Sequence, residues 1–212
     1  MEPNTIALPI LVVAATEMEL AGLPAKFAGD VRFFASGAGT PCTVMRLTEL
    51  LAREQFRLVI NIGIAGSYAM DVPVGSVFRI TEDSFADLGI ETEQGFVPLR
   101  EFPFCPPEVS SLNDGGSASV KLNLPTAIGY TFNTVHGSVE TIARLNISEG
   151  LETMEGAAVQ MVCRHFGIPH VQIREVSNYV EPRDPSRWNI PLAIQNLEAV
   201  TAKLIRQLIG EK

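Results

Sequence analysis

The stretch Leu58-Val59-Ile60-Asn61-Ile62 has the near-continuous apolar character of a strand that is buried on both faces of a parallel sheet. Apolar runs before and after it are separated by segments of helical periodicity. The pattern predicts strands over 10–15, 31–36, 77–81, 127–134 and 170–176, and helices over 16–27, 43–53, 139–145, 155–166 and 191–209. Strands that alternate with helices indicate an α/β fold, with a largely parallel central sheet flanked by helices on both sides.

The length and composition favour a single domain over 1–212. The chain has 212 residues, of which 46% are hydrophobic and 19% charged, and this suits one large core better than two small ones. The segment 85–119 is rich in Gly, Pro and Ser. We interpret it as a long irregular connection within the domain, because sheet-like sequence resumes after it.

Charge and cysteine usage limit the partners and the compartment. The net charge of −8 disfavours nucleic acid as a partner. The three cysteines have no regular spacing, which indicates a reducing compartment. The apolar stretch near the N-terminus contains Pro9 and lacks a basic flank, so it is interpreted as a strand and not as a signal peptide. No apolar run is long enough for a membrane span, and a cytoplasmic protein is expected.

Familiar cofactor and metal motifs are missing from the sequence. It contains no G-x-x-x-x-G-K-[ST] phosphate loop, no G-x-G-x-x-G and no H-E-x-x-H. The histidines His136, His165 and His170 lack metal-ligand spacing. We therefore expect neither a cofactor nor a metal.

Ligand sites of such sheets lie at the carboxyl ends of the strands, and the residues there are candidates for chemistry. Thr16-Glu17-Met18-Glu19 follows the first strand. Thr followed three residues later by Glu is the capping-box pattern, so Glu19 either caps a helix or projects into a site as a carboxylate base. Gly63 to Gly66, after the third strand, either let a ligand approach the backbone or form a tight turn.

Two later segments complete the set. Glu152-Thr153-Met154-Glu155-Gly156-Ala157-Ala158 opens a helix, where an acidic residue suits the helix dipole and small residues suit close packing. Arg174 to Val180 brings polar residues to the end of a strand, and Arg183, Asp184, Arg187 and Trp188 follow. Each segment has an ordinary structural explanation when taken alone.

Together and in this order, the four segments resemble the nucleoside phosphorylase and nucleosidase superfamily over nearly the whole chain. Within it, the Ser-Asn-Tyr-Val run ending at Val180, with Arg183, Asp184 and Trp188, is most similar to the futalosine hydrolases of menaquinone biosynthesis. The resemblance implies a twisted mixed sheet flanked by helices, and a homodimer or higher homo-oligomer. It also implies hydrolysis of the N-glycosidic bond of a purine nucleoside.

The resemblance implies roles for individual residues. Glu155 matches the carboxylate that holds the ribose hydroxyls, and Met154 would pack against the sugar. Glu19 matches the carboxylate that activates water. Arg174 matches a site arginine. Further carry-overs are Ile64 and Gly66 in the glycine-containing turn, Phe132 and Asn133 at the base pocket, and Arg183 as a partner for a distal carboxylate, unless Arg183 and Arg187 are only solvated loop residues.

Two positions bear on the reaction and the base. Comparable phosphorylases have Arg and Ser where this chain has Asn61 and Ile64, which favours water over phosphate as the nucleophile; adenine-specific nucleosidases also have Ser where Ile64 stands. Adenine-cleaving relatives have Asp where this chain has Asn178. An amide offers donors that suit a 6-oxopurine, and this favours futalosine. The alternatives are a methylthioadenosine/adenosylhomocysteine nucleosidase and a non-catalytic nucleoside-binding protein.

Overall fold

The computed structural model describes residues 8–27, 29–110, 113 and 122–210. Parts of the connection predicted over 85–119, namely 111–112 and 114–119, lie outside these residues, as do both ends of the predicted domain over 1–212. None of the described helices is long and apolar enough to cross a membrane.

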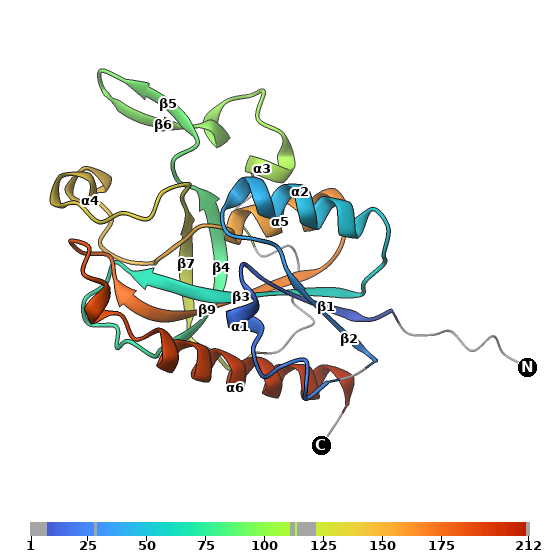
Figure 1. Ribbon diagram of the computed structural model, residues 1–212. Coiled ribbons are helices and arrows are strands. Elements are labelled where there is room, and N and C mark those ends of the chain that lie inside the picture. The colour runs from blue at the N-terminus through green and yellow to red at the C-terminus, as the bar shows by residue number, and fades with distance from the viewer. Residues whose placement is uncertain (1–7, 28, 111–112, 114–121, 211–212) are drawn as a thin grey trace, which may run out of the picture.

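A seven-stranded mixed sheet forms the centre of the fold (Figure 1). Its strands are β1 (Ile10–Ala14), β2 (Val31–Ala35), β3 (Leu58–Ser67), β4 (Val77–Phe85), β7 (Thr126–Thr131), β8 (Leu151–Thr153) and β9 (His170–Tyr179), in the order β2-β1-β3-β8-β7-β4-β9. The β3–β8 and β4–β9 pairs are antiparallel and the other pairs are parallel. Because β9 also pairs with β3, five of the strands close into a ring.

Helices cover both faces of the sheet (Figure 1). α6 (Ile190–Ile209) lies on one face, while α2 (Thr40–Leu51) and α5 (Gly156–His165) lie on the other. Alternate residues of β1 supply the two cores: Ile10 and Val12 pack toward α6, and Leu11 and Val13 pack toward α2 and α5. The predicted fold class, an α/β fold with a largely parallel central sheet between helices, is confirmed.

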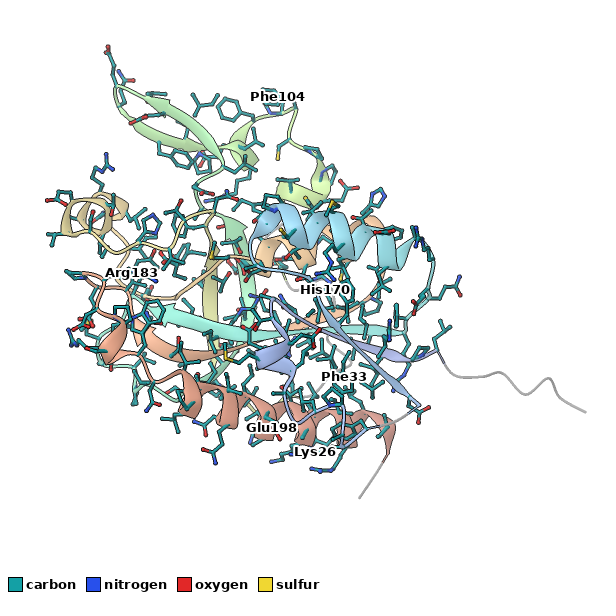
Figure 2. All side chains as sticks on the ribbon, viewed as in Figure 1. Lys26, Phe33, Phe104, His170, Arg183 and Glu198 are labelled. Atoms are coloured by element: carbon teal, nitrogen blue, oxygen red, sulfur yellow. The ribbon has the colours of Figure 1, made fainter. Side chains whose placement is uncertain are left out.

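The predicted helix over 16–27 is wrong in its length. α1 spans Glu17–Leu20 only. Ala21, at ψ 137°, already leaves the helical conformation, and Gly22 follows it in a left-handed conformation at φ +81°. The chain then follows α6, where Lys26 forms an ion pair with Glu198 (Figure 2).

The predicted end of the third strand at 62 is also wrong. β3 continues through Ser67, because its second half pairs with β9 along one side and with β8 along the other. Gly63 to Gly66 therefore lie inside a strand and not in a turn. β8 was missed because it has only three residues, Leu151–Thr153.

The connection after β4 contains structure that its composition did not indicate. A hairpin of β5 (Gly89–Thr92) and β6 (Gly95–Pro98) projects from the body of the protein (Figure 1). It is followed by a 3-10 turn, Leu99–Glu101, and a short helix, α3 (Pro107–Ser110). α4 (Val139–Leu145) begins and ends at the predicted residues.

Candidate active site

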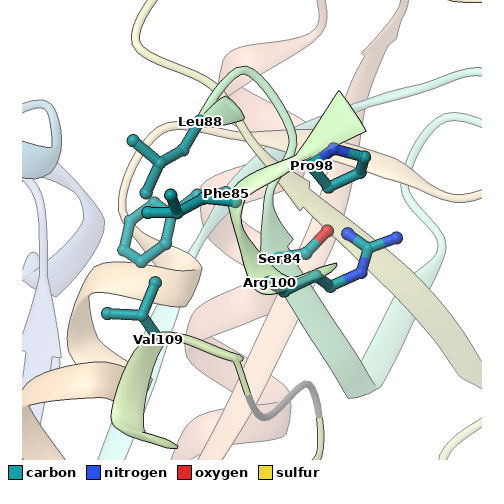
Figure 3. Close-up of a pocket in the computed structure, with 7 residues that line it drawn as sticks. Ser84, Phe85, Leu88, Pro98, Arg100 and Val109 are labelled. Carbon is teal, nitrogen blue, oxygen red and sulfur yellow. The ribbon is translucent and has the colours of Figure 1, made fainter. Parts of the chain in front are cut away.

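A pocket of about 240 Å³ opens where β1, β3 and β9 end and α5 begins. Six of the residues predicted for the site line it: Glu19, Ile64, Gly66, Met154, Glu155 and Asn178. A second cavity, beside the β5–β6 hairpin, is lined by Phe85, Leu88 and Val109 among others (Figure 3). Its volume of about 10 Å³ has room for about one water molecule, so it is not a substrate site.

Glu19 both caps α1 and faces the pocket. Its Oε2 accepts hydrogen bonds from the backbone N–H of Thr16 at 2.9 Å and from the Thr16 hydroxyl at 2.8 Å, which completes the capping box. Its Oε1 accepts the N–H of Ile64 across the site at 3.2 Å. The two interpretations of this residue are therefore compatible, because the cap fixes the carboxylate at the wall of the pocket.

Glu155 stands at the entry to α5, opposite Glu19. Its Oε1 accepts the backbone N–H of Gly39 at 2.6 Å, and the Thr40 hydroxyl donates to the carbonyl of Met154 at 3.2 Å. Burial raises the pKa of Glu155, and the charge of Glu19 raises it further, while the Gly39 N–H and Arg174 oppose the shift. The loop before α2 thus orients the carboxylate.

Arg174 lies behind the two carboxylates, with only 1% of its surface exposed. Its Nη1 donates to Asn61 Oδ1 at 3.3 Å and to the carbonyl of Ile173 at 3.2 Å. Burial lowers the pKa of Arg174, while the charges of Glu155, Asp83 and Glu19 oppose that shift. Arg174 is the buried cation among these three acidic groups.

Gly63 allows the Arg174 guanidinium and the Glu19 carboxylate to lie close to β3. A Cβ at this position would lie 3.0 Å from Arg174 Nη1 and 3.1 Å from Glu19 Oε1. Both distances are tighter than ordinary carbon contacts. The glycine therefore serves the approach of side chains to β3 rather than a turn.

A buried polar network supports α5 from behind. Asp83 accepts from Gln172 Nε2 at 2.8 Å and from the Thr131 hydroxyl at 2.9 Å, and that hydroxyl accepts the N–H of Ala157 at 2.8 Å. Burial raises the pKa of Asp83 to about 6. No local sequence pattern indicates this network, because its members come from four separate elements.

Asn178 lies at the other end of the pocket, beside Gly66. Its Oδ1 accepts the Ser177 hydroxyl at 2.8 Å and its Nδ2 donates to the carbonyl of Tyr179 at 2.9 Å. These two bonds fix the orientation of the amide and leave one N–H of Nδ2 for a ligand. A Cβ on Gly66 would lie 3.3 Å from that nitrogen, so this glycine makes room for the amide.

Glu152 and His136 also line the pocket, although the sequence analysis assigned them no role. Glu152 Oε2 accepts the hydroxyl of Tyr68 at 2.6 Å and lies 2.6 Å from His136 Nδ1. Its Oε1 accepts the backbone N–H of His136 at 3.0 Å. No local pattern indicates Glu152, because its strand, β8, has only three residues.

Four of the predicted site residues do not line this pocket: Arg174, Phe132, Asn133 and Arg183. Phe132 is buried beside Tyr68 and Val180, and it lines a wider cleft of about 900 Å³ next to the hairpin. Asn133 holds the carboxylate of Asp87 through its backbone N–H, at 2.9 Å, and through its side chain. Val135 and His136 occupy the pocket wall instead.

Arg183 is exposed at the edge of the protein (Figure 2). Its guanidinium carbon lies 4.8 Å from the ring centroid of Trp188, which does line the pocket. Arg187 is paired with Glu181 at 2.7 Å. Arg183 is therefore the arginine in contact with a pocket residue, through the ring of Trp188.

Known proteins of similar sequence are purine nucleosidases. The chain is 32% identical to a futalosine hydrolase of Streptomyces coelicolor over 70% of this chain and 65% of the relative. It is 31% identical to a futalosine hydrolase of Acidothermus cellulolyticus over 80% of this chain and 72% of the relative. It is 27% identical to a 5'-methylthioadenosine/S-adenosylhomocysteine nucleosidase of Shewanella frigidimarina over 98% of this chain and 96% of that relative.

Solved structures share the fold. The native futalosine hydrolase of Helicobacter pylori superposes with a TM-score of 0.78 at 16% identity, over 95% of this chain and 98% of that one. The Colwellia psychrerythraea nucleosidase in complex with adenine gives a TM-score of 0.77 at 22% identity, over 95% and 96%.

The names of the sequence relatives indicate that the chain is an N-glycosidase. Residues 25–209 match the sequence profile described as the Phosphorylase superfamily. Since that match covers most of the chain, the protein belongs to the phosphorylase superfamily.

Proposed function

We propose that the protein hydrolyses the N-glycosidic bond of futalosine, releasing hypoxanthine and dehypoxanthine futalosine in menaquinone biosynthesis. The observation that carries the proposal is the arrangement of Glu19 and Glu155 at one pocket, with Arg174 buried behind them. Futalosine hydrolases are among the relatives above 30% identity, which supports this choice of nucleoside.

The two carboxylates suit a reaction in which the sugar becomes positively charged. As the bond to the base breaks, the ribose takes on oxocarbenium character. Glu155 would accept hydrogen bonds from the two ribose hydroxyls, and Met154 would pack against the ring. Glu19 would take a proton from the water that attacks the anomeric carbon. Because three acidic groups surround one arginine, the local charge favours a cationic transition state.

The same charges disfavour phosphate as the nucleophile. A phosphate dianion at the pocket would meet Glu19 and Glu155. The buried guanidinium that could offset it already bonds Asn61 and the Ile173 carbonyl. A desolvated anion without a new partner is costly, so water is the favoured acceptor of the ribosyl group.

Asn178 supports a 6-oxopurine as the leaving base. Its amide orientation presents an N–H donor to the pocket. Donors suit the 6-oxygen and nitrogen 7 of hypoxanthine, whereas the exocyclic amine of adenine requires an acceptor. The other end of futalosine carries an aromatic carboxylate, for which Arg183 beside Trp188 is the candidate partner.

A methylthioadenosine/adenosylhomocysteine nucleosidase is the second candidate. Relatives with that name match 98% of this chain, which is a longer match than the futalosine hydrolases give. A non-catalytic nucleoside-binding protein is disfavoured, because binding alone does not require a carboxylate such as Glu19 held against the pocket.

We further propose a cytoplasmic homodimer or higher homo-oligomer. The hairpin and the segment after it expose Ile90, Phe96 and Phe104 at 44%, 46% and 68%, and apolar side chains gathered in one region favour association. Light scattering coupled to gel filtration would measure the assembly, and a monomeric mass at micromolar concentration would contradict it.

One assay tests the substrate. Purified protein is incubated with futalosine, inosine and methylthioadenosine, each with and without phosphate, and the free base is measured by chromatography. We expect hypoxanthine from futalosine at a rate that does not depend on phosphate. Preferential release of adenine from methylthioadenosine would select the second candidate, and release that requires phosphate would overturn hydrolysis.

A further inference from the structure

His136 is held by a buried carboxylate at the wall of the pocket. Its Nδ1 lies 2.6 Å from Glu152 Oε2, and the two side chains are 13% and 4% exposed. A carboxylate oxygen only accepts, so the proton of this hydrogen bond belongs to Nδ1. Nε2 is then the ring nitrogen left for a ligand, because no other described residue bonds it.

Glu152 already accepts too many hydrogen bonds from protein groups to bind the substrate itself. It accepts the Tyr68 hydroxyl, the His136 backbone N–H and His136 Nδ1, which accounts for three of about four lone-pair positions. Burial, together with the hydrogen bond to Glu152, raises the pKa of Tyr68, so Tyr68 remains a donor. Phe132 packs edge-on against the imidazole at 4.5 Å and fixes its plane.

His136 and Asn178 lie at the same end of the pocket. Gly66 pairs with Glu152 on one side and with Asn178 on the other. A Cβ on Gly66 would lie 3.3 Å from Asn178 Nδ2 and 3.9 Å from Glu152 Cβ. If Asn178 contacts the purine, as in the proposed function on which this inference rests, the imidazole held by Glu152 lies at the purine end too.

The departing purine needs a proton that Asn178 does not supply. When the glycosidic bond breaks, its electron pair goes to the base, and protonation of a base nitrogen neutralises that charge. The Asn178 amide donates a hydrogen bond but does not release a proton near neutral pH. A histidine held by a carboxylate at the wall of this pocket is suited to that transfer.

We propose that His136 is the general acid of the reaction, with Glu152 and Tyr68 as its positioning residues. The proton on Nε2 passes to the purine as the C–N bond breaks. Water bonds to the anomeric carbon and loses a proton to Glu19. Exchange with solvent then returns that proton from Glu19 to His136, so the cycle needs no other reactant.

The test compares His136→Asn with the wild-type enzyme on futalosine. The Asn amide can still donate to Glu152, but it has no nitrogen in the place of Nε2 and does not titrate. We expect kcat to fall by about 10²- to 10⁴-fold, the usual range for a general acid, with KM and the melting temperature nearly unchanged. The decline of kcat/KM at alkaline pH, which a general acid causes, should disappear.

Glu152→Gln is the companion variant. It removes the carboxylate charge beside the proton donor while the ring remains, so the alkaline decline of kcat/KM should move to lower pH. The cleft that His136 borders is lined by the charged residues Asp87, Glu91, Arg100 and Arg144. Arg183 packs against the neighbouring Gly137. An Arg144→Gln control should leave the position of the decline much closer to wild type than Glu152→Gln does.

Two results would overturn the inference. One is activity of His136→Asn within about threefold of wild type. The other is a loss of activity that leaves the alkaline decline in place, because the ring would then only shape the pocket. Failure of the wild-type enzyme to cleave futalosine would instead overturn the proposed substrate, and the variants would then be compared on the purine nucleoside that it does cleave.

Discussion

Glu155 accepts the Gly39 N–H and still faces the pocket, so its remaining lone pairs are available to two ribose hydroxyls. Hydrogen bonds to a charged acceptor contribute about 1.5–3 kcal/mol each. We therefore expect Glu155→Gln to lower kcat/KM by roughly a hundredfold or more while the fold is kept. Steady-state kinetics and a thermal melt measure the two effects, and near-normal kcat/KM would remove Glu155 from the site.

Glu19 has a structural and a proposed chemical task, and one substitution separates them. In Glu19→Gln the remaining side-chain oxygen can still accept the Thr16 N–H, so the cap is largely kept. The amide is no base, and turnover should fall by about 10²- to 10⁴-fold with substrate still bound. A variant that melts earlier but turns over normally would show that Glu19 serves only the cap.

Asn178 should set the preference for the base. In Asn178→Asp a carboxylate would face the 6-oxygen of hypoxanthine, acceptor against acceptor. An unsatisfied buried polar group costs roughly 1–3 kcal/mol, so futalosine cleavage should fall about ten- to hundredfold. The matched control is aminofutalosine, which differs in the base alone and should lose less or gain. Equal losses on both nucleosides would mean that Asn178 supports the loop and does not read the base.

Helices and strands with a strong local pattern were predicted correctly from the sequence. The boundaries of most buried strands and of the helices at 139–145 and 190–209 were predicted to within a few residues, because apolar periodicity reports burial directly. α1 was predicted too long and β3 too short. A glycine after an apolar run predicts the end of a strand, but Gly63 lies inside β3. Its missing side chain leaves room for Arg174 and Glu19.

The site was predicted in part for a similar reason. Glu19, Met154, Glu155 and Asn178 belong to local motifs, and all four line the pocket. The pair of His136 and Glu152 joins residues 16 positions apart through β8, a three-residue strand without a periodicity of its own. Contacts of this kind depend on tertiary packing, which a single sequence does not display.

Gly63 gives a prediction at the level of the strand. In Gly63→Ala the new Cβ would press on Arg174 Nη1 at 3.0 Å and on Glu19 Oε1 at 3.1 Å. Both side chains would have to move by a few tenths of an ångström, and we expect kcat/KM to fall roughly tenfold. Unchanged kinetics, in a variant that folds normally, would show that the position of these groups is not critical.

The whole molecule should lose stability as the pH rises, because of Glu175. This side chain is 0% exposed, and neither carboxylate oxygen has a hydrogen-bond partner within the described part of the chain. Burial raises its pKa to about 8 from the usual 4.5. Between these two pH values the unfolded chain releases a proton that the folded protein keeps, so the free energy of unfolding falls through this window.

Glu175→Gln tests this effect. The amide does not ionise, so the variant should gain stability relative to wild type as the pH rises from about 5 to 8 and keep a constant advantage above that range. Each kcal/mol corresponds to about 2–4 °C in a protein of this size. Glu54→Gln, at an exposed position, is the matched control. If the melting temperatures of all three proteins changed with pH in the same way, the assignment to Glu175 would be contradicted.

That one domain spans 1–212 remains a prediction, which limited proteolysis would examine.

The closure of β9 onto β3 affects how copies of the chain can meet. Open strand edges invite other chains to extend a sheet, and proteins limit them to avoid uncontrolled polymerisation. Among the described strands of the seven-stranded sheet, β2 is the one with a single neighbouring strand. Ordered growth by backbone pairing therefore has one starting point on this sheet. The hairpin, by contrast, leaves one edge of β5 and one edge of β6 without a partner strand among the described residues, so an assembly that buries it can add backbone pairing to side-chain packing.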